Sequence, residues 1–160
     1  MYHLSKKILE ENKYNHYEIS NFAKKGYESK HNLDCWNQEE YIGFGLAAHS
    51  YFQNKRYSNI ANLEEYIKNI NDGNFEKNIE MHEIQNEESK LKEYMMLGFR
   101  KIEGISISEF ERKFRINPLI YFRFEIDKLT NEDLIEVDLD NIRLTKKGLD
   151  LANIVFEEFV

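Results

Sequence analysis

The stretch Leu134-Ile135-Glu136-Val137-Asp138-Leu139-Asp140-Asn141-Ile142-Arg143-Leu144-Thr145 decides the fold of the second half of the chain. Apolar and polar residues alternate on both sides of the polar segment 138–140, which is the pattern of a β-hairpin. Thr145 follows the second strand directly and is a good cap for a closing helix that extends to about Phe159. We therefore predict a two-stranded wing followed by a final helix.

Three helices are expected before this hairpin. Residues 87–102 place apolar side chains at helical intervals, and Gly104 is a good stop signal for that helix. Ser106 or Ser108 caps a second, short helix. Pro118 suits the first turn of a third helix that has Asn117 as its cap and ends near Leu129. Three helices, a wing and a closing helix predict a winged-helix-like domain at residues 87–160.

The first half of the chain mixes helices and strands. Its predicted elements are helices at 2–13 and 62–70, a strand at 16–22, a loop at 24–36, and a turn running into a buried strand at 41–52. Asn62 is the candidate cap of the second of these helices. The polar stretch 71–86 starts with turn chemistry and contains few large apolar residues, so we expect a linker there. The fold class is therefore α+β, with a domain at 1–70 and a second domain at 87–160.

Composition excludes several classes of protein. The chain has 160 residues and a net charge of −7, and it carries one cysteine. Cys35 alone cannot form an internal disulfide, an all-cysteine zinc site or a cysteine-ligated cluster within this chain. No apolar run approaches the ~20 residues of a transmembrane helix, and no signal segment follows Met1. We expect a cytoplasmic protein that does not bind nucleic acid, because phosphate contacts require surplus basic residues.

The segment His31-Asn32-Leu33-Asp34-Cys35-Trp36 gathers an imidazole, a thiol and a large aromatic ring. Histidine and thiolate both ligate haem iron, and an indole stacks well against a flat macrocycle. The alternative is a packing role, in which His31 caps a backbone group and Trp36 fills the core. The residues by themselves favour packing, because isolated His and Trp usually serve that purpose.

Two other segments have the composition of ligand-contacting backbone. Gly43-Phe44-Gly45-Leu46-Ala47-Ala48-His49-Ser50 is rich in small residues, and glycine permits close approach of the backbone to a ligand. Taken alone, this segment favours a tight turn into a buried strand over a ligand cradle. Asn21-Phe22-Ala23 ends a predicted strand, where ligand contacts often gather in α/β folds.

A winged-helix domain raises the alternative of DNA recognition by the third helix. That helix offers Arg123 and Lys128, but Glu125 and Asp127 offset their charge. Readers of the major groove normally have basic support around the recognition helix, so the charge argues against this function. Salt-dependent binding of duplex DNA would support it.

The order of motifs resembles a known family. The matching segments are Tyr17–Lys24, Ser29–Asn32, Trp36, Tyr41–Gly45, Ala48–Ser50, Arg56–Asn59 and Leu144–Gly148. Together they resemble the C-terminal part of the oxygen-independent coproporphyrinogen III oxidase-like proteins of the radical S-adenosylmethionine (SAM) superfamily. Within that family the similarity is greatest to the haem-chaperone branch, HemW.

The resemblance implies that the chain is part of a longer protein. The family begins with a radical-SAM (β/α) barrel whose Cys-x-x-x-Cys-x-x-Cys motif holds a 4Fe–4S cluster, and that motif is absent here. Residues 1–70 would then supply the terminal strands and helices of the open barrel, and 87–160 its C-terminal domain. This chain alone is not expected to be an enzyme. Because its barrel edges would lack their partners, we also expect the chain to self-associate.

The resemblance also implies site residues. SAM contacts would come from Ala23 and from the segment that contributes Gly43, Gly45, Ala48 and His49. The chaperone branch carries a His-Asn-x-x-Tyr-Trp haem signature that His31, Asn32 and Trp36 match, whereas Cys35 replaces the tyrosine. Either His31 or Cys35 would ligate the haem iron.

The function implied by the resemblance is haem binding and delivery to recipient haem proteins, with haem or porphyrin and the protein's own N-terminal barrel as further partners. One alternative is true oxygen-independent coproporphyrinogen III dehydrogenation, which decarboxylates two propionates through a substrate radical. The other is a winged-helix module that binds DNA or a partner protein.

Overall fold

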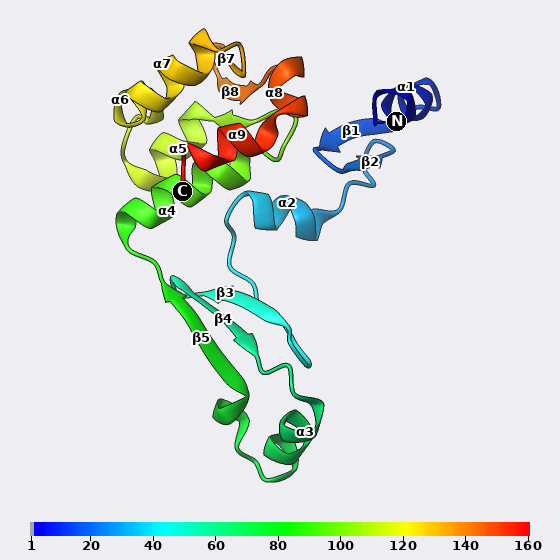
Figure 1. Cartoon of the computed structure of the whole chain (residues 1–160), viewed down its shortest axis with the longest axis vertical. Coiled ribbons are helices and arrows are strands. Elements are labelled where there is room, and N and C mark those ends of the chain that lie inside the picture. The colour runs from blue at the N-terminus through cyan, green and yellow to red at the C-terminus, as the bar shows by residue number, and fades with distance from the viewer. Residues whose placement is uncertain (1) are drawn as a thin grey trace. The chain divides into compact units, whose positions relative to one another are not determined.

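The computed structural model describes residues 2–160 and divides into two compact units (Figure 1). Unit 1 combines the N-terminal segment up to Gln38 with Leu91–Val160, and unit 2 is Glu39–Lys90. The fold is mixed α/β, and its sheets are open, so residues 2–160 form no closed barrel. None of the described helices is both long and apolar enough to cross a membrane.

The predicted hairpin is confirmed in unit 1. Strand β7 (Ile135–Val137) pairs antiparallel with β8 (Asn141–Leu144), and residues 138–140 make the turn. The wing has a third strand that the sequence pattern did not indicate, because β6 (Ile105–Ser106) pairs with the other edge of β8. The winged-helix classification of this region stays a prediction.

The helices around this sheet are α4 (Glu87–Gly98), α5 (Ile107–Phe114), α6 (Pro118–Tyr121), α7 (Arg123–Asn131), α8 (Lys146–Asp150) and α9 (Ala152–Glu157). Ser106, not Ser108, caps α5, since its side chain accepts a hydrogen bond from the Glu109 N–H. Asn117 and Thr145 cap α6 and α8 as predicted. The sequence predicted one continuous third helix and one continuous closing helix. The third helix is interrupted at Phe122 and the closing helix at Leu151.

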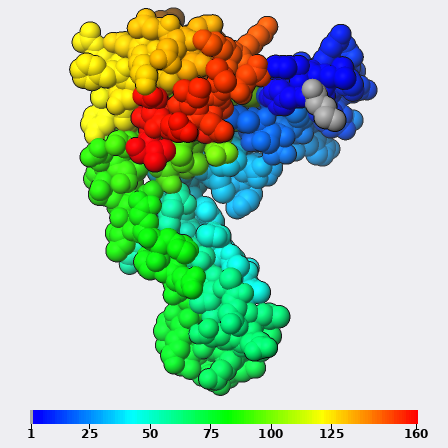
Figure 2. Space-filling model, in the orientation of Figure 1, coloured from blue at the N-terminus to red at the C-terminus, as the bar shows by residue number. Residues whose placement is uncertain are grey.

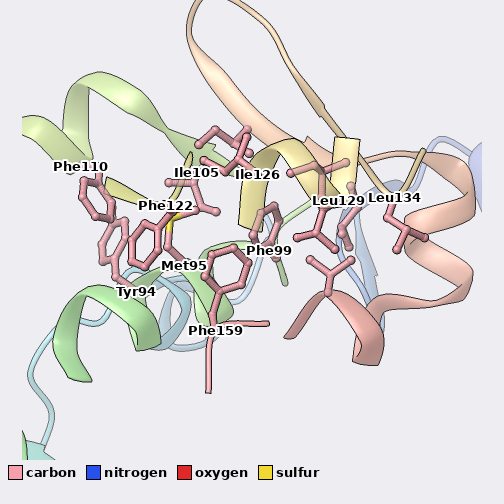
Figure 3. Close-up of a cluster of buried hydrophobic side chains, with 14 of the residues drawn as sticks. Tyr94, Met95, Phe99, Ile105, Phe110, Phe122, Ile126, Leu129, Leu134 and Phe159 are labelled. Atoms are coloured by element: carbon pink, nitrogen blue, oxygen red, sulfur yellow. The ribbon is translucent and has the colours of Figure 1, made fainter. Parts of the chain in front are cut away.

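The core of unit 1 is aromatic. The side chains of Phe99, Phe122 and Phe159 point toward one another, and Phe110 contacts Phe122 edge to face (Figure 3). Phe99 and Phe110 are fully buried. In the space-filling view, the yellow-to-red region from α6 to α9 forms one continuous surface (Figure 2). The N-terminal elements of unit 1 join its C-terminal part through backbone hydrogen bonds from Ile19 N–H to the Arg100 carbonyl and from Ile102 N–H to the Tyr17 carbonyl.

The N-terminal part of unit 1 contains α1 (Tyr2–Glu11), β1 (Asn15–Glu18), β2 (Asn21–Ala23) and α2 (Lys30–Trp36). The single strand predicted at 16–22 is a hairpin, because β1 pairs antiparallel with β2. The prediction of a loop at 24–36 was wrong for its second half, because Lys30–Trp36 form helix α2. That helix has seven residues and no buried side chain, so it leaves no apolar periodicity in the sequence.

Unit 2 is a three-stranded antiparallel sheet in the order β3 (His49–Phe52), β4 (Lys55–Asn59), β5 (Ile79–Ile84). Helix α3 (Leu63–Asn71) is capped by Asn62 as predicted, and the short 3-10 helix η1 (Phe75–Asn78) precedes β5. The expected linker at 71–86 therefore contains regular structure, since β5 pairs with β4 along its length. The family domain boundaries at 1–70, 71–86 and 87–160 stay a prediction.

Candidate functional site

Helix α2 carries the residues predicted to bind haem. Ser29 caps it, because the Ser29 Oγ accepts a hydrogen bond from the Asn32 N–H at 3.3 Å. The same hydroxyl donates to the Asn32 Oδ1 at 3.1 Å. Asn32 therefore belongs to the structure that begins the helix, which gives this signature residue a local structural role.

His31 and Cys35 lie one helical turn apart on the same face of α2. The His31 Nε2 and the Cys35 Sγ are 3.8 Å apart. His31 is exposed and Cys35 is half-buried. Axial ligands of haem iron occupy opposite faces of the macrocycle, so two donors facing each other from adjacent turns are alternatives for one axial position.

Trp36 packs against the C-terminal part of unit 1. The Arg100 guanidinium carbon lies 4.9 Å from the centroid of the Trp36 ring and 5.0 Å from that of Phe156. Both distances are within the range of cation–π attraction. Trp36 thus has the packing contact that the packing alternative expects, and it remains half-buried rather than enclosed.

The C-terminal end of α2 is held by two lysines. Lys101 Nζ donates to the Asn37 Oδ1 at 2.6 Å, and Lys113 Nζ donates to the backbone carbonyls of Asn37 and Gln38 at 2.9 and 3.2 Å. Cationic donors at a helix C-terminus also interact favourably with its dipole. Burial lowers the pKa of Lys101. These contacts fix the direction in which α2 presents His31.

Ala23, a predicted SAM contact, is buried at the end of β2. It lines a hollow of about 490 Å³ together with Tyr14, Phe22, Lys24 and Tyr27. The Lys24 ammonium lies 5.4 Å from the centroid of the Tyr14 ring. A small side chain beside an open hollow is compatible with a ligand contact, and that role stays a prediction.

The remaining predicted SAM contacts lie in unit 2, in and after the turn of residues 43–50. The Gly43 N–H donates to the Ser50 Oγ at 3.0 Å, and a Cβ at Gly43 would lie 2.2 Å from the His49 carbonyl oxygen. Gly45 has a φ of +104°. Glycine is therefore required for the turn itself. The tight turn into a buried strand is confirmed, and Ala48 ends it by accepting a hydrogen bond from the Asn59 N–H at 2.9 Å.

His49 has a neighbour that sequence reasoning missed. Its ring stacks on that of His82, with centroids 5.7 Å apart, and the Ser58 Oγ lies 2.8 Å from the His82 Nε2. His49 and His82 are 33 positions apart in the sequence, and only the β3–β4–β5 register brings them together. The predicted SAM contacts are therefore distributed over both units, with Ala23 in unit 1 and the others in unit 2.

A second hollow in unit 1, of about 960 Å³, was also missed by sequence reasoning. His16 and Leu33 line one part of it, and Arg143 and Lys147 line another. His16 Nε2 lies 3.2 Å from both the Tyr2 hydroxyl and the Ile19 carbonyl oxygen. Burial lowers the pKa of His16. The lining of this hollow mixes both charges and shows no preference for an anion or a cation.

A 4Fe–4S cluster does not fit the donors of this chain. Such a cluster is held by several cysteine thiolates, whereas Cys35 is the single cysteine of the sequence. Within residues 2–160, no three His, Cys, Asp or Glu side chains come together in a metal-binding arrangement.

Part of the chain matches a known protein family. Residues 85–151 match the family model described as the HemN C-terminal domain. The chain contains a HemN C-terminal domain. The Lys101 and Lys113 side chains that hold α2 both come from this domain, as does Arg100.

Homologues that cover the whole chain are HemW haem chaperones. The chain is 39% identical over 160 residues to the haem chaperone HemW of Lactococcus lactis and 37% identical over 160 residues to that of Bacillus subtilis. These matches cover 100% of this chain and 41% and 42% of the relatives, so the chain spans about two fifths of their length.

A solved structure has the same fold. Coproporphyrinogen III oxidase (HemN) from Escherichia coli, described as a radical SAM enzyme, matches with a TM-score of 0.74 at 15% identity. The match covers 98% of this chain and 39% of that chain. At this identity the similarity shows the fold alone. The fold that the two chains share therefore extends over nearly the whole of this chain and is not confined to the HemN C-terminal domain.

Proposed function

We propose that the chain is the haem-handling part of a HemW-like haem chaperone. The observation that carries this proposal is the similarity to HemW chaperones over all 160 residues, which include the signature on α2. The accessible position of His31 on that helix supports it, because a chaperone must both accept and release its cargo.

Haem in this proposal is cargo, and α2 is its platform. His31 or Cys35 provides one axial ligand, since the Nε2 and the Sγ face each other across 3.8 Å. Asn32 keeps the first turn of α2 in place through its contacts with Ser29. Trp36 lies beside the macrocycle. An axial ligand on an exposed helix leaves the opposite face of the iron open to a ligand from a recipient haem protein.

The rest of the parent protein is proposed on the same similarity. Its N-terminal radical-SAM barrel would hold the cluster and SAM, which supply radical chemistry when both are bound. In that protein, Ala23 of unit 1 and Gly43, Gly45, Ala48 and His49 of unit 2 would contact SAM. This chain has no donor set for the cluster, so we assign it no catalytic step.

Coproporphyrinogen III oxidation is the less favoured alternative. The curated relatives that match the whole chain are haem chaperones, and the oxidase structure shares only the fold at 15% identity. The winged-helix binding module has no specific contact in its favour, because Arg123 on the expected reading helix is already paired with Asp127.

Titration of the chain with haemin tests the proposal. The wild-type chain should give a Soret band whose position shifts in His31→Ala and shifts differently in Cys35→Ser, because imidazole and thiolate affect the iron differently. His3→Ala removes another exposed histidine and is the matched control. If neither substitution on α2 changes the spectrum, α2 does not ligate the iron.

A further inference from the structure

Arg100 carries a charge that no carboxylate balances. It lies in the turn after α4, with its guanidinium beside the rings of Trp36 and Phe156. No Asp or Glu within residues 2–160 forms an ion pair with it, and its Nε is buried without an acceptor. Arg143, by contrast, forms an ion pair with Glu136 at 2.6 Å. A partly buried charge without a counter-ion is unfavourable, so this position is suited to an anion from outside the chain.

A second unfilled donor lies at the same place. The Trp36 Nε1 is buried and has no acceptor among the described residues. Native proteins pair most buried N–H groups, so two unpaired donors on side chains in mutual contact indicate a missing acceptor. A guanidinium fork matches the two oxygens of a carboxylate better than any other common group.

We propose that Arg100 binds a propionate carboxylate of the haem, an inference that rests on the proposed function. Haem carries its two carboxylates along one edge of the ring. The Arg100 guanidinium lies beside the indole of Trp36, so a macrocycle placed beside Trp36 would bring a propionate within its reach. Arg100 thereby sets the orientation of the cargo and selects porphyrins with free carboxylates.

The experiment compares free acids with esters, with and without iron. Haemin, haemin dimethyl ester, protoporphyrin IX and its dimethyl ester are titrated into the wild-type chain, Arg100→Met and Arg112→Met. Arg112 is an exposed arginine of α5 and provides the matched control. The wild type should bind each free acid about tenfold more tightly than its ester, as expected for one charge-assisted hydrogen bond. Arg100→Met should abolish that preference, whereas Arg112→Met should retain it.

The iron-free porphyrins separate this inference from the proposed function. His31→Ala should weaken the binding of haemin but not that of protoporphyrin IX. Arg100→Met should weaken the binding of both. Suppose that the wild type binds esters as tightly as acids, while His31→Ala or Cys35→Ser still shifts the Soret band. The Arg100 inference is then overturned and the chaperone proposal stands. If the wild type does not bind haemin, both are overturned.

A folding control keeps the test decisive. Far-ultraviolet circular dichroism shows whether Arg100→Met folds, and Arg100→Lys provides a second variant that retains the charge but loses the fork. Arg100→Lys should retain part of the preference for free acids. An unchanged preference in every folded Arg100 variant contradicts the inference.

Discussion

The HemN C-terminal domain buries a cluster of large apolar side chains, whereas unit 2 leaves most of its large apolar side chains exposed. In the domain, Phe99 and Phe110 are fully buried. In unit 2, Phe44 is 90% exposed, and Ile67 on the apolar face of α3 is 50% exposed. The same amphipathic pattern thus predicts a helix in both regions, but only the domain contains the partner that covers it.

This difference shows which region has its own source of stability. Burial of apolar surface is the main favourable term in folding, so the domain stabilises itself through its aromatic core. Unit 2 buries Tyr51 and Ile60 but leaves much of its apolar surface in solvent. Apolar patches of that kind mark interaction surfaces. We therefore expect substitutions to affect folding in the domain and association in unit 2.

The largest effect is expected from Phe99→Ala. Its side chain is fully buried against Phe159, and removal of a buried phenyl ring lowers the free energy of unfolding by about 3–5 kcal/mol. Phe44→Ala, the matched change in unit 2, should alter it by less than about 0.5 kcal/mol. Urea unfolding followed by circular dichroism measures both. Equal effects of the two variants would remove the contrast between the regions.

Glycine replacement gives a smaller contrast. Gly104 has a φ of +77°, and a Cβ there would lie 2.1 Å from the Ile142 carbonyl oxygen. Gly104→Ala should therefore lower the free energy of unfolding by about 2–3 kcal/mol, because it adds both backbone strain and overpacking. Gly45 also has a positive φ, but beyond its chain neighbours no atom would lie within 4 Å of a Cβ at that position. Gly45→Ala should cost about 1 kcal/mol, measured by the same unfolding experiment.

Acidification should weaken the N-terminal part of unit 1 through His16. Burial lowers the pKa of His16 from its ordinary value of 6.5, so the unfolded chain binds the proton more readily than the folded chain. Stability is therefore complete above pH 6.5 and decreases as the pH falls from 6.5 through the lowered folded pKa. His16→Gln should reduce this pH dependence, as measured by urea unfolding at neutral and mildly acidic pH. A pKa for His16 above 6.5 by NMR would contradict this sign.

The smallest effect on stability is expected from Ile67→Lys. The side chain lies on the exposed apolar face of α3, so the free energy of unfolding should change by less than about 0.5 kcal/mol. Self-association of the chain should decrease, because a charge is introduced into apolar surface that association would cover. Sedimentation velocity measures this, and a monodisperse wild-type monomer would contradict it.

Local signals in the sequence predicted the hairpin of the domain and helix caps in both units. The hairpin at 135–144 and the caps Asn62, Asn117 and Thr145 depend on residues close in sequence, and each is present. The third strand of the wing was not predictable in this way, because the β6 residues that pair with β8 lie 37 and 35 positions earlier in the chain.

The candidate site was less accessible to sequence reasoning. The residue types of the signature on α2 could be recognised in the sequence, but the side chains that hold the end of this helix, Lys101 and Lys113, come from far along the chain. Arg100 beside Trp36 and His82 beside His49 also depend on tertiary packing and strand register. No spacing in the sequence encodes such pairs.

The contact between Lys113 and the end of α2 joins residues 76 positions apart. Since ribosomes build proteins from the N-terminus, the helix emerges long before its anchor has been translated. A nascent polypeptide therefore has the signature without the support that orients it. Under the proposed function, an iron porphyrin would meet an oriented α2 only after Lys113 has been translated.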